Sequence, residues 1–116
     1  MTPTVEGVWE TKTYVVGGNG TPVDGVLFLT AGRWATLYFV PGEQGPWGSA
    51  EAGEYRFEGQ RLTFMHRLIF QGGGGRPLQI DQQAAREEEC AVVFAGDRLT
   101  ISFPSGNHLH LERAAA

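Results

Sequence analysis

Hydrophobic and polar side chains alternate most clearly between Gly53 and Phe70, where the sequence reads GEYRFEGQRLTFMHRLIF. Alternation with a period of two is typical of a β-strand, in which successive side chains point to opposite faces. The break at Glu58-Gly59-Gln60 predicts a tight turn, because glycine adopts the positive φ that short hairpin turns need. One face of the predicted hairpin is apolar except for one histidine, and it carries Tyr55, Phe57, Leu62, Phe64, His66, Leu68 and Phe70. The opposite face carries Glu54, Arg56, Thr63, Met65, Arg67 and Ile69.

The rest of the chain repeats this short-period pattern between clusters of turn-forming residues. Further strands are expected at Gly7–Val16, Val23–Thr30, Arg33–Val40, Leu78–Ala84, Cys90–Ala95, Arg98–Phe103 and His108–Arg113. Loops are expected at Gly17–Gly20, Pro41–Gly48 and Gln71–Pro77, the last being glycine-rich and expected to be the most flexible. The charged run Arg86–Glu89 is expected to be a solvated strand start or turn. No segment keeps a 3.6-residue apolar period, so no helix is predicted beyond one turn at Ala84–Cys90.

Consecutive strands joined by short turns predict an antiparallel up-and-down arrangement. We expect about eight to ten strands, and a sheet of that size is stable as a closed barrel because closure removes unpaired edges. The predicted fold is therefore all-β, with one antiparallel barrel domain over residues 1–116. A barrel of about eight strands either fills its interior with side chains or encloses one small ligand.

The predicted hairpin about Ala31-Gly32 is apolar on both faces. With a two-residue turn, one face carries Phe28 and Leu37 and the other carries Leu29, Trp34 and Tyr38. A three-residue turn would exchange the two sets, so the sequence leaves open which set points into the barrel. Strands that are apolar on both faces lie between two apolar layers or contact a partner. The segment Val26–Val40 is therefore a candidate homodimer surface.

Composition narrows the function classes. The chain has a net charge of -4 and no basic patch, so we expect no nucleic-acid partner. No apolar stretch approaches the ~20 residues that span a bilayer, and the first residues lack the basic and apolar regions of a signal peptide. We therefore expect a cytoplasmic protein without a membrane partner. The single cysteine, Cys90, excludes an intrachain disulfide and falls on the same face as Val92 and Phe94, which indicates a buried thiol.

Several motifs carry a family resemblance. The first strand contains Gly7-Val8-Trp9, and three hairpins read GVLFLTAGRWAT, GEYRFEGQRLTF and FAGDRLTISF. From Gly7 to Arg113 the chain resembles small bacterial lipocalin-like domains of the calycin group, although it lacks the disulfide pattern and the second signature turn of secreted lipocalins. The resemblance implies that Trp9 closes one end of the barrel and that Arg113 stacks against it. The group includes ligand carriers and cofactor-free cyclases of natural-product pathways.

His66 is the sharpest candidate for chemistry, because it lies among apolar side chains on a face expected to point inward. It could be a general acid or base, could anchor a polar group of a ligand, or could be a core histidine with a protein partner. The expected walls of a ligand site are Trp34, Tyr38, Tyr55, Phe57 and Phe64. Tyr38 is a second catalytic candidate, because a buried phenol needs a hydrogen-bond partner that a ligand can supply.

Other polar residues are given structural roles. His108 and His110 with Glu112 and His66 could form a metal site, but Leu109 and Leu111 are the expected inward pair, so we predict no metal. The carboxylates of Glu54, Glu58 and Glu87–Glu89 are expected on the solvated surface. The loop Pro41–Gly48 could act as a lid, with Trp47 as its apolar cover, or could be a plain surface loop. No cofactor motif is present.

The sequence thus predicts a barrel that binds a small, largely apolar or aromatic molecule. One alternative is a cofactor-free cyclase or isomerase acting on a polyketide-like substrate in the same cavity. A second alternative is a barrel with a solid interior that serves as an interaction module and dimerises.

Overall fold

The computed structural model describes residues 4–81 and 86–114, and these contain nine β-strands and no helix. The strands are β1 (Gly7–Val16), β2 (Asn19–Thr30), β3 (Arg33–Val40), β4 (Trp47–Glu58), β5 (Arg61–Gly73), β6 (Arg76–Asp81), β7 (Arg86–Ala95), β8 (Arg98–Ser102) and β9 (His108–Arg113). All of the paired strands are antiparallel. No helix in this part of the chain is long and apolar enough to cross a membrane.

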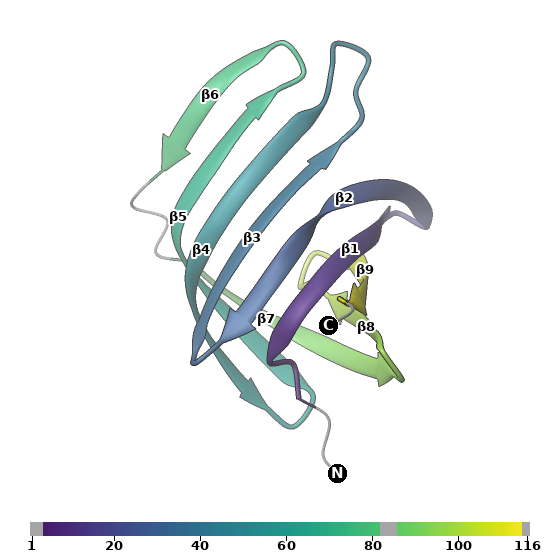
Figure 1. The fold of residues 1–116 in the computed structure, drawn as a ribbon, viewed down its shortest axis with the longest axis vertical. Helices are drawn as coiled ribbons and strands as arrows, with labels where there is room; N and C mark the ends of the chain where they lie inside the picture. Colours follow the sequence, from purple (N-terminus) through teal and green to yellow (C-terminus); the bar gives the residue numbers. More distant parts are fainter. Residues whose placement is uncertain (1–3, 82–85, 115–116) are drawn as a thin grey trace.

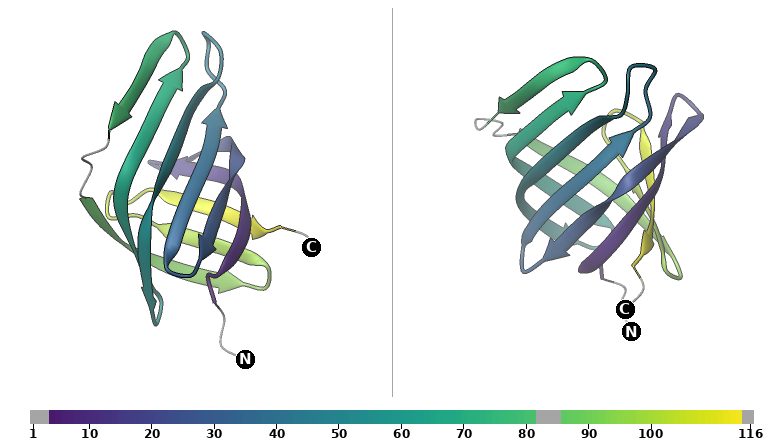
Figure 2. Two further views of the ribbon diagram at one scale, coloured as in Figure 1. Left: turned by 60° about the vertical axis from the view of Figure 1, so that its left-hand side comes forward. Right: turned by 45° about the horizontal axis from the view of Figure 1, so that its top comes forward.

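Eight of the strands close into an up-and-down barrel, which confirms the predicted fold class. The hydrogen-bonded order runs β4-β3-β2-β1-β9-β8-β7-β5, and pairing between β4 and β5 completes the ring (Figure 1). The ninth strand, β6, pairs with the same edge of β5 as β7 does, but further along that strand. The first half of β5 pairs with β7, whereas its second half pairs with β6. Strands β3 to β6 therefore rise above the remainder of the barrel as a curved wall (Figure 2).

Two expected loops are wrong, because their glycines form tight turns rather than open segments. The expected loop Gly17–Gly20 is a turn at Gly17 and Gly18, both at positive φ, so β2 begins at Asn19 instead of Val23. In the glycine-rich segment, β5 extends to Gly73 and β6 begins at Arg76. Cross-strand hydrogen bonds use the backbone alone, so glycine can continue a ladder that side-chain patterning does not reveal.

The two strands on either side of residues 82–85 begin or end at other residues than expected. The weak strand predicted at Leu78–Ala84 is β6, Arg76–Asp81, and residues 82–84 lie outside the described residues. The charged run Arg86–Glu89 is the start of β7, which confirms the first of its two expected roles, a strand start, over the second, a turn. The described part of Ala84–Cys90, residues 86–90, is strand rather than a helical turn.

A β-bulge in β5 corrects the face assigned to its second half. Gly53 pairs with His66, whereas the residue before it, Ala52, pairs with Leu68. Arg67 is therefore an extra residue in β5. An extra residue exchanges the two faces of the strand beyond it. Leu68 and Phe70 consequently do not share the inward face of His66, as simple alternation predicted. Ile69, 8% exposed, and Gln71, on the cavity wall, take that face instead.

The hairpin of β2 and β3 has a two-residue turn at Ala31-Gly32, with Thr30 paired to Arg33. Both turn residues have positive φ, which the type I′ hairpin geometry requires. This register resolves the question that the sequence left open. Leu29 and Trp34 are buried, whereas Phe28 and Leu37 are exposed on the outside of the barrel.

One end of the barrel is closed by Trp9, which is fully buried. Its indole N–H donates a hydrogen bond to the Val5 carbonyl oxygen at 2.8 Å. The guanidinium of Arg113 lies 4.2 Å from the centre of the Trp9 ring, the stacking that the family resemblance implies. Arg113 also donates hydrogen bonds to the carbonyl oxygens of Thr4 and Glu6. The beginning and the end of the described chain are thereby joined across this end of the barrel (Figure 2).

Candidate functional site

The other half of the barrel encloses a cavity of about 560 Å³. This volume lies within the range of pockets that hold small molecules, roughly 300–1,000 Å³. Six aromatic side chains line the cavity: Tyr14, Trp34, Tyr38, Trp47, Phe64 and Phe103. Aliphatic side chains, among them Val23, Leu27 and Leu109, fill the wall between them.

The structure brings four of the six residues expected at a ligand site together on this wall. Trp34, Tyr38, Phe64 and His66 all line the cavity. Tyr55 and Phe57 are not among its described lining residues, and instead pack partly buried against the core. They pair with Phe64 and Leu62 on the inward face as the alternation predicts, but at the end of the barrel where side chains fill the interior.

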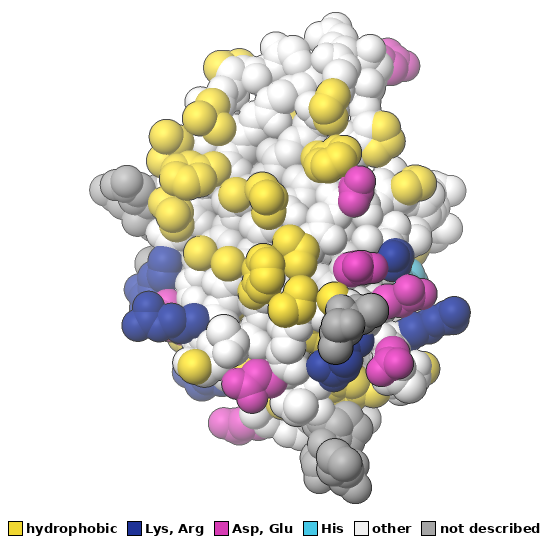
Figure 3. Space-filling view, in the orientation of Figure 1, with side chains coloured by type: hydrophobic (Ala, Val, Ile, Leu, Met, Phe, Trp, Pro, Cys, Tyr) yellow, Lys and Arg dark blue, Asp and Glu magenta, His cyan; other side chains and the backbone are white. Residues whose placement is uncertain are grey.

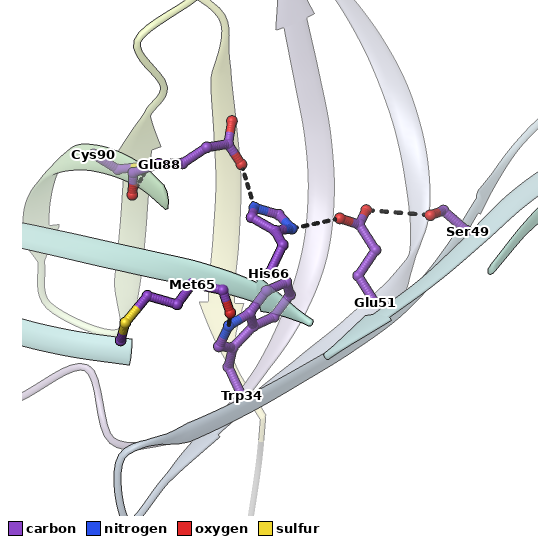
Figure 4. A network of polar contacts seen from close by, with 7 residues as sticks. All are labelled: Trp34, Ser49, Glu51, Met65, His66, Glu88 and Cys90. Carbon is purple, nitrogen blue, oxygen red and sulfur yellow. Dashed lines mark hydrogen bonds and ion pairs between the residues drawn. The ribbon is translucent and has the colours of Figure 1, made fainter. Parts of the chain in front are cut away.

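His66 lies between two carboxylates on the cavity wall (Figure 4). Its Nε2 atom is 2.6 Å from Oε1 of Glu88, a hydrogen bond. Its Nδ1 atom is 3.1 Å from Oε1 of Glu51, a contact close enough for an ion pair but not aligned as a hydrogen bond. The other oxygen of Glu51 accepts a hydrogen bond from the Ser49 hydroxyl at 3.2 Å. Both ring nitrogens of His66 therefore face carboxylate oxygens.

Each member of this cluster is placed by its strand. Ser49, Glu51 and Gly53 alternate along the inward face of β4, which lies beside β5. Glu88 precedes buried Cys90 by two residues on β7 and so shares its inward face. The pairing of β5 with β4 on one edge and with β7 on the other brings the two carboxylates to opposite sides of the imidazole.

The carboxylates set the charge of the histidine. Burial lowers the pKa of His66, but the contacts with Glu51 and Glu88 outweigh burial and raise it to about 9. His66 is consequently an imidazolium at neutral pH, with a proton on each nitrogen. The hydrogen bond from His66 lowers the pKa of Glu88 against the opposing effect of burial, and the charge of Arg86 lowers it further. The cluster is thus two carboxylates that share one cation.

Trp34 packs against the imidazole ring of His66. The two rings meet edge to face with 5.0 Å between their centres, and the indole N–H of Trp34 donates a hydrogen bond to the Met65 carbonyl oxygen at 3.3 Å. Gly53 makes this approach possible. A Cβ atom at Gly53 would lie 1.8 Å from the Met65 oxygen and 3.0 Å from the Trp34 nitrogen. Glycine is therefore required beside His66 for reasons of space.

Tyr38 and Trp47 form the aromatic part of the wall nearer the raised strands. Their ring centres are 6.3 Å apart. Burial raises the pKa of Tyr38 to about 12, and the charge of Glu51 adds to this effect, so the phenol keeps its proton. Trp47 was expected in a loop that could act as a lid, but it is the first residue of β4 and lines the cavity.

Two residues of the cluster were missed by the sequence reasoning. Glu88 was assigned to a solvated run, yet its side chain is only 29% exposed and turned toward His66. Its spacing of two from Cys90 and four from Val92 was the available signal, because those two residues were expected to be inward. Glu51 was overlooked because the expected strand began at Gly53, whereas β4 begins at Trp47.

The remaining candidates take structural positions. His108 and His110 form hydrogen bonds with the hydroxyls of Ser102 and Thr100. On the same strand, Leu111 is buried and Leu109 lines the cavity, so this pair faces inward as predicted. Cys90 is buried as predicted, and burial raises the pKa of its thiol to about 12. Among residues 4–81 and 86–114, no group of three or more histidine, cysteine or acidic side chains has the arrangement that could hold a metal ion.

The chemistry open to this site follows from the engaged ring nitrogens. A histidine that already carries two protons at neutral pH cannot accept one from a bound molecule. The carboxylates of Glu51 and Glu88 hold acceptor capacity beyond their contacts with His66, and both line the cavity. The arrangement is therefore a fixed pair of acceptors with a histidine that orients them. Comparison of the chain with protein-family models, with curated proteins and with solved structures found no match.

Proposed function

We propose that this chain is a lipocalin-like barrel that binds a small, largely apolar or aromatic molecule in its interior. The observation that carries the proposal is the cavity of about 560 Å³, which is lined by six aromatic side chains and by the polar cluster of Glu51, His66 and Glu88. Binding sites for small molecules combine apolar walls with a few fixed polar groups in this way. The lipocalin-like assignment is supported by the Gly7-Val8-Trp9 sequence and by the stacking of Arg113 on Trp9.

The geometry favours binding over the cyclase or isomerase alternative. A general base must be able to take a proton from the substrate, and a general acid must be able to reach the reacting atom. His66 is already protonated, and each of its nitrogens faces a carboxylate. Tyr38, with its pKa raised to about 12, is a poor proton donor. Neither of these two residues is therefore suited to transfer a proton to or from a bound molecule.

Binding of a neutral aromatic dye tests the proposal. N-phenyl-1-naphthylamine fluoresces more strongly when it leaves water for an apolar site, and it should bind with one site per chain. Replacing Leu109, on the cavity wall, by tryptophan should fill the interior and weaken dye binding by about tenfold or more. The matched control is Val93→Trp, because Val93 is 58% exposed on the outside of β7. Equal dye binding by Leu109→Trp and the wild type would refute the proposal.

A second candidate function, self-association, is favoured by the outer surface. Among the described residues, five of the eight exposed large hydrophobic side chains lie on the outer face of β2, β3 and β6: Phe28, Leu37, Phe39, Leu78 and Ile80. Figure 3 shows hydrophobic side chains gathered over this part of the molecule, with most charged side chains below them. Contiguous exposed apolar surface of this kind marks an interaction site.

The occupant that this face fits is a second copy of the same chain. Cross-strand pairing aligns Val26, Leu37, Ala50, Phe70 and Ile80 in one row across five strands. Spacings of ~4.8 Å between strands and ~6.8 Å between rows give five strands and three rows an area of about 490 Å². With a polar rim, that approaches the ~800 Å² per partner of a stable interface. The small side chain of Ala50 between Leu37 and Phe70 offers a groove into which the ridges of an identical face can pack.

Sedimentation velocity tests this second candidate. The wild-type chain should sediment as a dimer at micromolar concentration. Leu37→Glu should convert it to a monomer, because an uncompensated charge would be buried at the centre of the interface. Val93→Glu, at an equally exposed apolar residue on β7, should remain dimeric. A monomeric wild type, or a dimer that survives Leu37→Glu, would exclude this face as the interface.

A further inference from the structure

The cavity wall points to a definite ligand class. We infer that the bound molecule carries a cationic amine, which is held by the carboxylates of Glu51 and Glu88 while its apolar body lies against the aromatic side chains. This inference rests on the proposed binding function and assigns the ligand chemistry of that same cavity. It follows from three observations, which concern hydrogen bonding, charge and the aromatic wall.

The first observation is that the polar cluster offers acceptors to the cavity. The His66 side chain is only 5% exposed and uses its donors toward Glu51 and Glu88. The Ser49 hydroxyl donates to Glu51. Glu88 has a second carboxylate oxygen beyond the one that His66 contacts, and its side chain is 29% exposed. A ligand group that meets this cluster must therefore supply the hydrogen-bond donors.

The second observation is an imbalance of charge. Two carboxylates flank one imidazolium, so the cluster carries one negative charge in excess. Among the described residues, the only other charged side chain on the cavity wall is Arg86. Arg86 is exposed, so solvent screens its charge more than it screens the charges of the partly buried carboxylates. Partly buried carboxylates gain most from a second cation placed beside them.

The third observation is the density of aromatic rings around the cluster. Trp34 contacts His66 edge to face, and Tyr38 and Trp47 stand together on the adjoining wall. The faces of tryptophan, tyrosine and phenylalanine attract cations through the ring quadrupole, and desolvation strengthens this attraction. Aromatic rings combined with carboxylates are consequently suited to an organic ammonium ion. A carboxylate-bearing ligand would instead bring a third negative charge to the same wall.

Displacement of N-phenyl-1-naphthylamine by three matched indoles tests the inference. Tryptamine carries an ammonium group at neutral pH, 3-methylindole is neutral, and indole-3-propionate carries a carboxylate. We expect tryptamine to displace the dye at a concentration about tenfold or more below that of 3-methylindole, which corresponds to ~1.4 kcal/mol. Indole-3-propionate should be the weakest of the three.

Two variants locate the preference within the cavity. Glu88→Gln keeps the shape of the side chain but removes its charge, and it should reduce the preference for tryptamine over 3-methylindole by about fivefold or more. Glu89→Gln is the matched control, because Glu89 lies next to Glu88 on β7 but pairs with Arg61 on the surface. This control should leave the preference unchanged. Dye binding by each variant shows that its cavity is intact.

The possible results separate this inference from the function on which it rests. If the dye binds but 3-methylindole or indole-3-propionate displaces it as well as tryptamine does, or if none of the three displaces it, the amine assignment is wrong while the binding function stands. A tryptamine preference that survives Glu88→Gln also overturns the assignment. If the dye does not bind to the wild type, the proposed function itself fails.

Discussion

The Nε2 atom of His66 lies 2.6 Å from Oε1 of Glu88, although the two residues are 22 positions apart in the chain. The contact joins β5 to β7 across the first half of β5, where these two strands are paired. Glu51 reaches the same imidazole from β4, on the other edge of β5. Three strands of the barrel are thus joined by one buried cation. Its removal should lower the stability of the fold and alter the wall of the cavity.

We expect His66→Leu to destabilise the chain by about 3 kcal/mol at neutral pH, because it leaves two partly buried carboxylates facing each other without a cation. Urea unfolding followed by tryptophan fluorescence measures the change. His110→Leu is the control, since His110 is exposed and pairs with Thr100 outside the barrel; it should cost less than about 1 kcal/mol. An unchanged or increased stability of His66→Leu would mean that the ion pairs contribute nothing to the fold.

The stability of the wild type should fall as the pH rises from about 6.5 to about 9. The folded-state pKa of His66, about 9, is above that of an unfolded histidine near 6.5, so its contribution is fully present below the unfolded value and is lost above the folded one. The shift corresponds to at most about 3 kcal/mol. Urea unfolding at several pH values should show this slope in the wild type and its loss in His66→Leu. Parallel pH profiles of the two proteins would contradict the shift.

At acidic pH, protonation of Glu88 should lower the stability of the folded state. Its pKa is lowered from 4.5 by the hydrogen bond from His66, so its contribution is present above that value and is lost as the pH falls through the lowered one. Glu88→Gln should therefore flatten the acid limb of the stability profile. Glu89→Gln, which alters a surface pair, should keep the wild-type acid limb; if both variants behave alike, the His66–Glu88 contact is not the cause.

Gly53→Ala should destabilise the barrel by about 2–3 kcal/mol, because its Cβ atom would overlap the Met65 carbonyl oxygen, which is backbone and cannot move aside easily. Thermal unfolding measures this loss. The same substitution should also disturb the Trp34–His66 contact and weaken dye binding. A variant with wild-type stability would show that β4 and β5 are separated more widely here than the structure indicates.

Arg113→Met should cost about 1–3 kcal/mol, since it removes the stacking on Trp9 and two hydrogen bonds to backbone carbonyls. Arg113→Lys should restore only part of the loss, because an ammonium group cannot make the planar contact of a guanidinium. Neither variant should change dye affinity, as neither Trp9 nor Arg113 is among the residues that line the cavity. A large loss of dye binding in folded Arg113→Met would contradict this expectation.

The fold could be predicted because the patterns that specify its strands and turns lie within short segments of the sequence. Alternation along Gly53–Phe70 and the glycines of the hairpin turns specified the strands, and the number of strands implied closure. The second half of β5 could not be predicted, because the bulge at Arg67 depends on the fit of β5 to β4 rather than on the identity of Arg67. The continuation of β5 through Gly72 and Gly73 was missed for a related reason, since the backbone pairing of these glycines with β4 has no side-chain signature.

Only part of the candidate site could be predicted from the sequence. His66 and three aromatic residues of the cavity were recognisable from their places on apolar faces. The carboxylates that give the histidine its charge were not recognised, because an isolated charged run favours a surface interpretation. Glu88 becomes inward only once Arg86–Ala95 is a single strand, and Glu51 becomes inward only once β4 extends back to Trp47. Partners across a sheet depend on register, which sequence patterning leaves undetermined.

Native mass spectrometry of the chain purified from its own host tests the central claim, that the cavity holds a small molecule, most directly. The wild type should carry one non-covalent adduct of small-molecule mass that is absent after denaturation. Leu109→Trp, prepared in parallel, should carry none because the cavity is filled, while Val93→Trp should carry the wild-type adduct. A wild type without adduct, or the same adduct on Leu109→Trp, would contradict the claim.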